Sequence, residues 1–108
     1  MKLLTKELEA RFAKVGSQEE LLAEKQMCIA KFFNPTGIGR WFATEYNPEE
    51  KMFFGYVSLF GDHCDEWGYF TLEELKSYKD KVFGLGIERD LNFQETPMSE
   101  IIKQYTKE

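Results

Sequence analysis

The greatest concentration of reactive side chains in the sequence is the run Asp62-His63-Cys64-Asp65-Glu66. A thiol next to an imidazole suggests a cysteine nucleophile or a metal site. However, the side chains of adjacent residues usually diverge, and a nucleophile and its base are normally brought together by the fold. A closed zinc site needs four ligands, typically with Cys-x-x-Cys spacing. We therefore interpret the run as a solvated loop, with neither a catalytic residue nor a bound metal.

Paired carboxylates are a second source of chemistry. Glu88 and Asp90 are two residues apart, so in a strand they share one face while Arg89 points to the other. Such a pair can act as general acid and base in a small hydrolase, provided that a pocket separates their pKa values. The same spacing suits ion pairing along an edge strand, which opposes aggregation, and we favour this interpretation. Glu45 and Arg40 are candidates to join the network.

Aromatic residues offer contact surfaces. The segment Phe54-Gly55-Tyr56-Val57 partly matches the centre of the RNA-recognition-motif signature, but lacks the base and the glycine that should precede it. Trp41, Phe54 and Tyr56 are candidates to stack on the bases of a single-stranded nucleic acid. Tyrosine and tryptophan also suit protein contacts, because an apolar ring carries a hydrogen-bonding tip. The sequence leaves both alternatives open.

The elements that position these residues begin and end with helices. Thr5 is a suitable cap for a helix over about residues 6–14, and Gly16 is a suitable stop. Ser17 to Glu20 has capping-box spacing, so either a short helix through residues 21–23 or a loop follows. A second capping box, Thr71 to Glu74, predicts a helix to about residue 78. Pro97 at a first helical position predicts a last helix to about residue 105.

Strands fill the middle of the chain. Short turns separate the first three, which predicts an antiparallel meander. An α+β fold follows, with a meander sheet of about four to five strands and short helices at both chain ends, in a single domain over residues 1–108. The expected strands are 27–33, 40–46, 52–60 and 67–70, with an edge strand within 87–93.

Both faces of this sheet are predicted to be apolar. The third strand alternates so that Phe53 and Val57 share one face while Phe54 and Tyr56 share the other. Twelve of the 17 aromatic residues lie between residues 32 and 70, which places the core there. An antiparallel sheet with one solvated face would alternate apolar and polar residues. Either helices cover both faces, or one face meets a partner.

The net charge of −5 is unevenly distributed. Acids and bases balance outside residues 62–74, and the whole excess lies in that segment, in Asp62, Asp65, Glu66, Glu73 and Glu74. No cluster of lysine and arginine suits a nucleic acid duplex, and no basic amphipathic helix suits a membrane. The N-terminus lacks a signal-peptide pattern, and two cysteines do not form a disulfide framework. We expect a cytoplasmic protein with reduced thiols.

Patterns for common cofactors are also missing. Gly84-Leu85-Gly86 lacks the third glycine of a dinucleotide loop, and there is no Walker lysine pattern or nucleophile elbow. We therefore predict no cofactor and find no positive sign of an enzyme.

Six phrases of the sequence, taken in order, resemble one family, the domain-of-unknown-function family twenty-nine fifty-eight. The resemblance runs from about Leu3 to Ile101, and it is weaker over residues 22–26 and 62–66. It implies a small accessory protein of conjugative plasmids and integrative elements, in a prokaryotic cytoplasm. The family brings no activity, cofactor or catalytic residue. The phrases are LLTKELEARFAKVGSQE, AKFFNPTG, WFATEYNPEE, FFGYVSLFG, GYFTLEEL and IERDLNFQETPMSE.

The leading hypothesis is a non-enzymatic protein-interaction module of a mobile element. One version is an anti-defence protein that occupies a basic surface of a host nuclease or effector by electrostatic complementarity. A second copy of the chain is another candidate partner. The alternatives are a single-stranded nucleic-acid binder and a small hydrolase using Glu45, Glu88, Asp90 or the His63 loop. The predicted partner-binding residues are Trp41, Phe54, Tyr56, Asp62, Asp65, Glu66 and Trp67.

Overall fold

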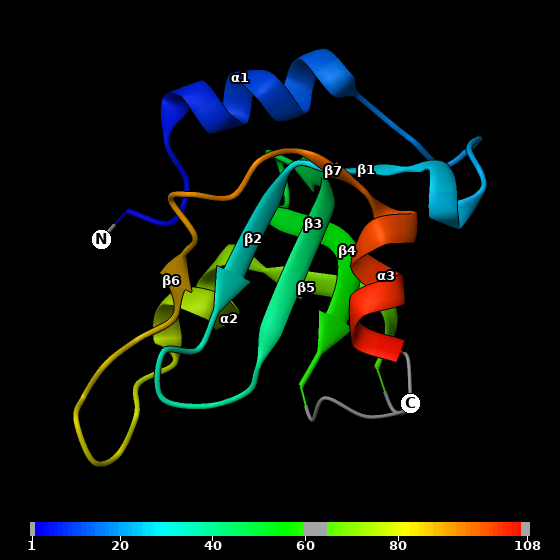
Figure 1. The fold of residues 1–108 in the computed structure, drawn as a ribbon. Coiled ribbons are helices and arrows are strands. Elements are labelled where there is room, and N and C mark those ends of the chain that lie inside the picture. The colour runs from blue at the N-terminus through cyan, green and yellow to red at the C-terminus, as the bar shows by residue number, and fades with distance from the viewer. Residues whose placement is uncertain (1, 60–64, 107–108) are drawn as a thin grey trace.

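The main layer of the protein is a five-stranded antiparallel sheet (Figure 1). The computed structural model describes the chain apart from Met1, residues 60–64 and residues 107–108. Strands lie in the order β5-β4-β3-β2-β6, so that β2 to β5 form the predicted meander. A separate two-stranded sheet pairs β1 (Met27–Cys28) with β7 (Thr96–Pro97). The main strands are β2 (Ala30–Phe33), β3 (Arg40–Asn47), β4 (Met52–Ser58), β5 (Glu66–Thr71) and β6 (Glu88–Arg89).

Helices lie near both chain ends, which confirms the predicted α+β fold. In α1 (Lys6–Val15), the Thr5 side chain accepts a hydrogen bond from the Leu8 N–H, and Gly16 ends the helix with φ 68°. The helix α2 (Leu72–Ser77) opens with a complete capping box. The helix α3 (Met98–Thr106) follows β7 directly, and a short 3₁₀-helix, η1, covers Ala23–Lys25. None of the helices in the described part of the chain is long and apolar enough to cross a membrane.

The predicted strand 27–33 is divided between the two sheets. β1 pairs with β7, whereas β2 pairs with β3 and β6. Between them, the Ile29 N–H still donates to the Ala43 carbonyl oxygen at 2.8 Å. The division has a packing cause, because Cys28 and Ile29 are buried in two different cores. The prediction of one continuous strand was therefore wrong.

Of the two alternatives for residues 21–23, the loop holds at 21–22, and Ala23 opens the 3₁₀-helix η1. Ser17 Oγ accepts from the N–H of Glu19 rather than forming a capping box. Two other predicted boundaries differ. Pro97 belongs to β7, and the helix begins at Met98, whose N–H donates to the Gln26 carbonyl oxygen at 2.7 Å. The edge strand is only Glu88–Arg89, since Asp90 turns the chain by accepting from the N–H of Asn92.

Both faces of the sheet are covered. On the first face, α1, α2 and the N-terminal segment pack over Phe32 and Phe53. On the second face, α3 packs over Phe42 and Tyr56. The buried members of the first core are Leu3, Leu4, Phe12, Ile29, Ala30, Phe32, Ala43, Phe53, Phe70, Leu75 and Ile87. Those of the second core are Cys28, Phe42, Tyr56, Met98 and Ile101.

A β-bulge in β3 determines which side chains reach each face. Ala43 pairs with Gly55 and Glu45 pairs with Phe54, so that Thr44 is an extra residue without a partner in β4. Thr44 is fully buried, and its hydroxyl donates to the Phe54 carbonyl oxygen at 3.1 Å. Because the bulge adds one residue, Glu45 lies on the second face beside Phe54.

Gly55 allows the two central strands to approach closely at this bulge. A Cβ atom on Gly55 would lie 1.8 Å from the carbonyl oxygen of Phe42, far inside van der Waals contact. The cross-strand neighbour of Gly55 on the other side is Gly68, where an added Cβ would have no atom within 4 Å. The close approach therefore requires glycine at position 55 but not at position 68.

We predict that Gly55→Ala lowers the free energy of unfolding by about 3 kcal/mol, because the new methyl group forces β3 and β4 apart. Gly68→Ala is the matched control and should change it by less than about 0.5 kcal/mol. Chemical denaturation measures both. Equal stability of the two variants would contradict the close approach.

A second prediction concerns pH. Arg11 in α1 donates to both carboxylate oxygens of Glu95, at 2.6 and 2.7 Å, and this hydrogen bonding lowers the pKa of Glu95 from its ordinary 4.5. The stabilisation is therefore present above pH 4.5 and is lost as the pH falls through the lowered pKa. Glu95→Gln should lower the Tm at pH 7 by a few degrees at most, because the pair is partly exposed, and should have no effect at pH 2.

The control for this pH prediction is Glu20→Gln, which removes an exposed carboxylate from the loop before η1. Its Tm should follow that of the wild type at both pH values. A Glu95→Gln effect of the same size at pH 2 and pH 7 would show that the ion pair is not its cause.

Candidate functional site

Four aromatic side chains form a row across β4 and β5 on the second face of the sheet. Tyr56 meets Trp67 edge-on, with ring centroids 5.8 Å apart, and Trp67 stacks on Phe54 at 5.9 Å. Phe54 contacts Tyr69 at 4.9 Å. The row changes from buried to exposed along its length, since Tyr56 is 4% exposed and Tyr69 is 72% exposed. The second core therefore continues at this edge into an accessible aromatic surface.

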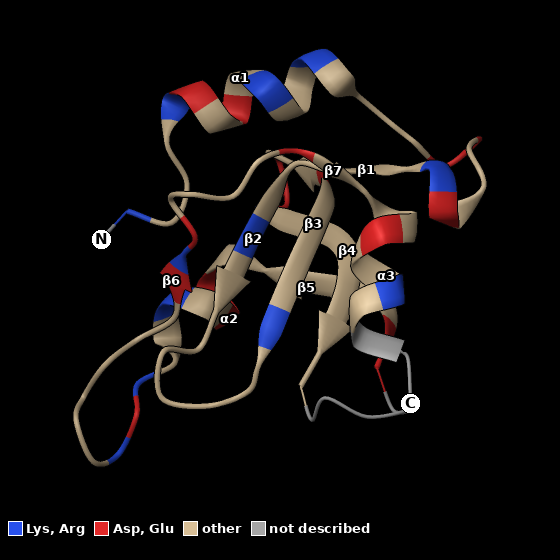
Figure 2. Ribbon diagram, viewed as in Figure 1, with Lys and Arg blue, Asp and Glu red and all other residues tan. Residues whose placement is uncertain are grey.

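A small pocket of about 270 Å³ lies at the exposed end of this aromatic row. We call it the acidic pocket, because two of its five lining residues are carboxylates. Figure 2 shows that the sheet strands carry few charges and that acidic residues gather on the loop before η1. The lining residues are Glu19, Gln26, Glu45, Phe54 and Tyr69.

Gln18 positions one side of the acidic pocket. Its backbone N–H donates to Glu45 Oε2 at 2.9 Å, which orients that carboxylate. Its buried side chain donates to the carbonyl oxygens of Thr44 and Met27, and accepts from the N–H of Met27 at 2.6 Å. One glutamine therefore connects the loop before η1 to the bulge in β3 and to β1.

Gln26 contributes an unusual acceptor to the pocket lining. The residue is 6% exposed, and its Nε2 donates to the Leu21 carbonyl oxygen at 3.3 Å. Its Oε1 is buried and has no hydrogen-bond partner among the described residues. Buried polar atoms are normally paired, so an unsatisfied carbonyl oxygen beside a pocket favours a donor that binds there.

The chemistry of the acidic pocket suits a cation. Neither Glu19 nor Glu45 forms an ion pair with any residue that the structure describes. Carboxylate oxygens accept charge-assisted hydrogen bonds from ammonium and guanidinium groups, and aromatic ring faces attract the same groups. The pocket thus combines oxygen acceptors with the rings of Phe54 and Tyr69. Nothing in it resembles a nucleophile with an adjacent base.

The structure brings some of the predicted partner-binding residues together. Phe54, Tyr56 and Trp67 all belong to the aromatic row. Trp41 instead packs against the first core, on the opposite face of the sheet. Trp41, Phe54 and Tyr56 therefore do not form one stacking platform for a nucleic acid, and Tyr56 is additionally buried beneath α3.

The predicted acidic residues have separate surroundings. Asp65 accepts from the Ser58 hydroxyl at 2.9 Å, whereas Glu66 is exposed at the start of β5. Glu74 is occupied by the capping box of α2. Asp62, together with His63 and Cys64, lies outside the described residues. The acids that line the pocket with Phe54 and Tyr69 are Glu19 and Glu45, from other parts of the chain.

The candidate carboxylate network is spread over the sheet. Asp90 forms an ion pair with Lys31 at 3.6 Å, while Glu88 lines a different and larger cleft. The Arg89 guanidinium donates to the Lys2 carbonyl oxygen at 3.5 Å. β3 lies two strands from β6, or about 10 Å across the sheet. Trp41 of β3 is level with Arg89 of β6, and Glu45 lies four residues further along β3, or about 13 Å. Glu45 thus does not share a site with Glu88 and Asp90.

Thiol and metal chemistry find no support in the described residues. Cys28 is completely buried, and burial raises the pKa of its thiol far above the ordinary value. A buried, protonated thiol is a poor nucleophile. No group of three or more histidine, cysteine, aspartate or glutamate residues is arranged to hold a metal within the part of the chain that the structure describes.

Sequence reasoning missed three residues of the pocket. Tyr69 had a usable signal, because it is two residues after Trp67 and strand alternation places both on one face. Glu19 and Gln26 had none, since they come from a loop whose path depends on tertiary hydrogen bonds.

A family model matches residues 3–107 of the chain, and its description is "Protein of unknown function (DUF2958)". The chain belongs to this family. The match confirms the resemblance drawn from the six phrases of the sequence, and it covers both the aromatic row and the acidic pocket. A search of curated proteins and a search of solved structures found no match.

Gln18 yields a testable prediction about the scaffold of the pocket. We expect Gln18→Ala to lower the free energy of unfolding by about 3 kcal/mol, because it leaves buried groups of Met27 and Thr44 unpaired. Gln94→Ala, at an exposed glutamine, should change it by less than about 0.5 kcal/mol. Urea denaturation followed by tryptophan fluorescence measures both values. Indistinguishable midpoints would contradict the role of Gln18.

Proposed function

We propose that this protein is a non-enzymatic protein-interaction module, and that it binds a basic segment of a partner protein at the aromatic row and the acidic pocket. The observation that carries the proposal is the exposed aromatic end of the row beside two carboxylates with no ion pair among the described residues. An aromatic anchor next to a charged pocket is a common arrangement at protein interfaces.

The geometry favours a protein partner over a small substrate. The acidic pocket has room for one side chain, and the aromatic row beside it extends the contact surface along β5. β5 is also an edge strand of the described sheet. A lysine or arginine of the partner would place its charged group in the pocket, while its neighbours pack on Trp67 and Tyr69.

We place this function in the context suggested by the family resemblance, an accessory gene of a conjugative plasmid or integrative element in a prokaryotic cytoplasm. A basic partner surface suggests an anti-defence role, in which the protein covers the nucleic-acid-binding face of a host nuclease or effector. Such faces are rich in lysine and arginine, and an acidic surface complements them.

Affinity purification from the host, followed by binding measurements on the enriched protein, tests the proposal. The variant is the double substitution Glu45→Gln with Tyr69→Ala, which removes one charge and one ring without touching the buried core. We expect wild type to enrich a basic protein, and the double variant to bind it about tenfold more weakly. Raising the salt concentration should weaken wild-type binding.

Leu91→Ala is the control variant, since Leu91 is 65% exposed and lies away from the pocket. It should bind like wild type. Equal binding by the double variant and wild type would contradict the proposal, and so would the absence of any enriched protein. Concentration-dependent dimerisation that the double variant abolishes would instead identify a second copy of the chain as the occupant.

A further inference from the structure

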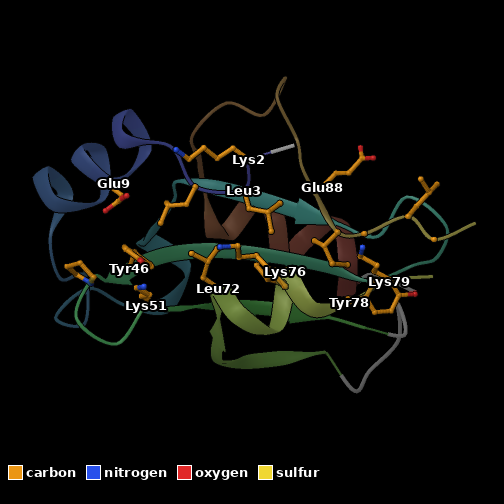
Figure 3. Close-up of a pocket in the computed structure, with 17 residues that line it drawn as sticks. Lys2, Leu3, Glu9, Tyr46, Lys51, Leu72, Lys76, Tyr78, Lys79 and Glu88 are labelled. Atoms are coloured by element: carbon orange, nitrogen blue, oxygen red, sulfur yellow. The ribbon is translucent and has the colours of Figure 1, made fainter. Parts of the chain in front are cut away.

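A cleft with a volume of about 950 Å³ lies on the first face of the sheet (Figure 3). Several parts of the chain enclose it: the N-terminal segment, the start of α1, the end of β3 with the turn that follows it, α2, and the segment before β6. They are far apart in the sequence, so the cleft is a tertiary feature. Its volume is in the range of small-molecule sites.

The floor of this cleft is aliphatic. Leu3 and Leu4 come from the N-terminal segment, Leu75 comes from α2, and Ile87 comes from the segment before β6. All four are less than a tenth exposed and belong to the first core, so the floor is fixed by packing. A rigid apolar floor favours a ligand that has an apolar body.

The rim of the cleft is basic. Lys2, Lys51, Lys76 and Lys79 line it, against the two carboxylates of Glu9 and Glu88. None of the four lysines forms an ion pair with a described residue. The lining therefore carries two more positive than negative charges, although the whole chain carries a net charge of −5.

Polar groups gather at one end of the cleft. In Figure 3, Lys76 extends toward Tyr46 and Lys51, while Lys79 and Tyr78 lie at the other end. Burial, and then the negative charge of Glu9, raise the pKa of Tyr46, so its hydroxyl keeps its proton and remains a donor. This end of the cleft therefore offers two ammonium groups and one hydroxyl as donors to an anionic group, beside the single carboxylate of Glu9.

The backbone at Lys51 gives independent support. Its φ of 52° lies in the left-handed region, where glycine or asparagine is usual, and it is the only non-glycine residue with positive φ among those described. A lysine at this position therefore carries a conformational cost. Backbone strain of this kind is frequent at functional sites.

We propose that this cleft binds a small amphipathic anion, with an aliphatic body on the leucine floor and a phosphate or carboxylate at Lys51, Lys76 and Tyr46. The site goes beyond the proposed partner binding, because it lies on the opposite face of the sheet and has the opposite charge. Lysine ammonium groups are common ligands of both anions, so the shared chemistry is a singly or doubly charged oxyanion.

NMR titration of the full-length protein tests this inference with four probes. Octyl phosphate and octanoate carry both features and distinguish the two anions, whereas inorganic phosphate lacks the apolar body and octanamide lacks the charge. We expect saturable shifts of Leu3, Leu75 and Lys51 amides with at least one amphipathic anion. Inorganic phosphate and octanamide should each bind about tenfold more weakly or not at all.

Two variants separate binding from folding. Lys51→Gly removes an ammonium group and relieves the left-handed backbone, so its Tm should equal or exceed that of wild type while anion affinity falls about tenfold. Lys76→Gln should weaken binding similarly at unchanged Tm. The matched controls are Lys14→Gln and Lys103→Gln, which remove charges from α1 and α3 outside the cleft.

Saturable binding that Lys51→Gly and Lys76→Gln weaken, and that the control variants preserve, would support the site. The absence of saturable binding by both octyl phosphate and octanoate would overturn it. So would equal weakening by all four variants, because that result indicates general charge attraction. The double variant Glu45→Gln with Tyr69→Ala should bind these probes like wild type, so that failure of this inference is distinguishable from failure of the proposed partner binding.

Discussion

The bulge at Thr44, held by the close approach of β3 to Gly55, is the constraint on which the rest of the structure depends. Without the extra residue, strand alternation would place Glu45 on the first face with Ala43. With it, Tyr46 joins the first core, where its ring lies 4.8 Å from that of Phe53, and Glu45 turns to the second face. The aromatic core and the acidic pocket are therefore set by the same irregularity.

Coverage of the sheet explains where surfaces remain for binding. Two helices and the N-terminal segment cover the first face, whereas α3 and Phe93 pack over the second. One helix of nine residues covers the sheet near Tyr56 but does not bury the far end of the row at Tyr69. The exposed rings therefore continue the second core beyond the point where α3 ends. In this way the fold presents an apolar surface while its buried residues stay packed.

Local signals were sufficient for much of this fold. The Thr5 and Thr71 caps, the Gly16 stop and the turn residues between strands act within a few residues, so sequence alone places those elements. The division of strand 27–33 and the bulge at Thr44 depend on which core each side chain enters, and no local pattern encodes that. The same limit applies to the acidic pocket, because Glu19 and Gln26 reach it only through the tertiary hydrogen bonds of Gln18 and the packing of η1.

Two surfaces of opposite charge can coexist on so small a protein because the sheet separates them. Glu45 lines the acidic pocket and its neighbour Tyr46 lines the basic cleft, so consecutive residues of β3 serve opposite faces. The apolar layers between them have a low dielectric constant, but each set of charges faces solvent, where salt screens it over about 8 Å. An anion in the cleft would thus have little direct electrostatic effect on a cation in the pocket. The Thr44 bulge lies between the two surfaces, and the buried hydrogen bonds of Gln18 hold it in place.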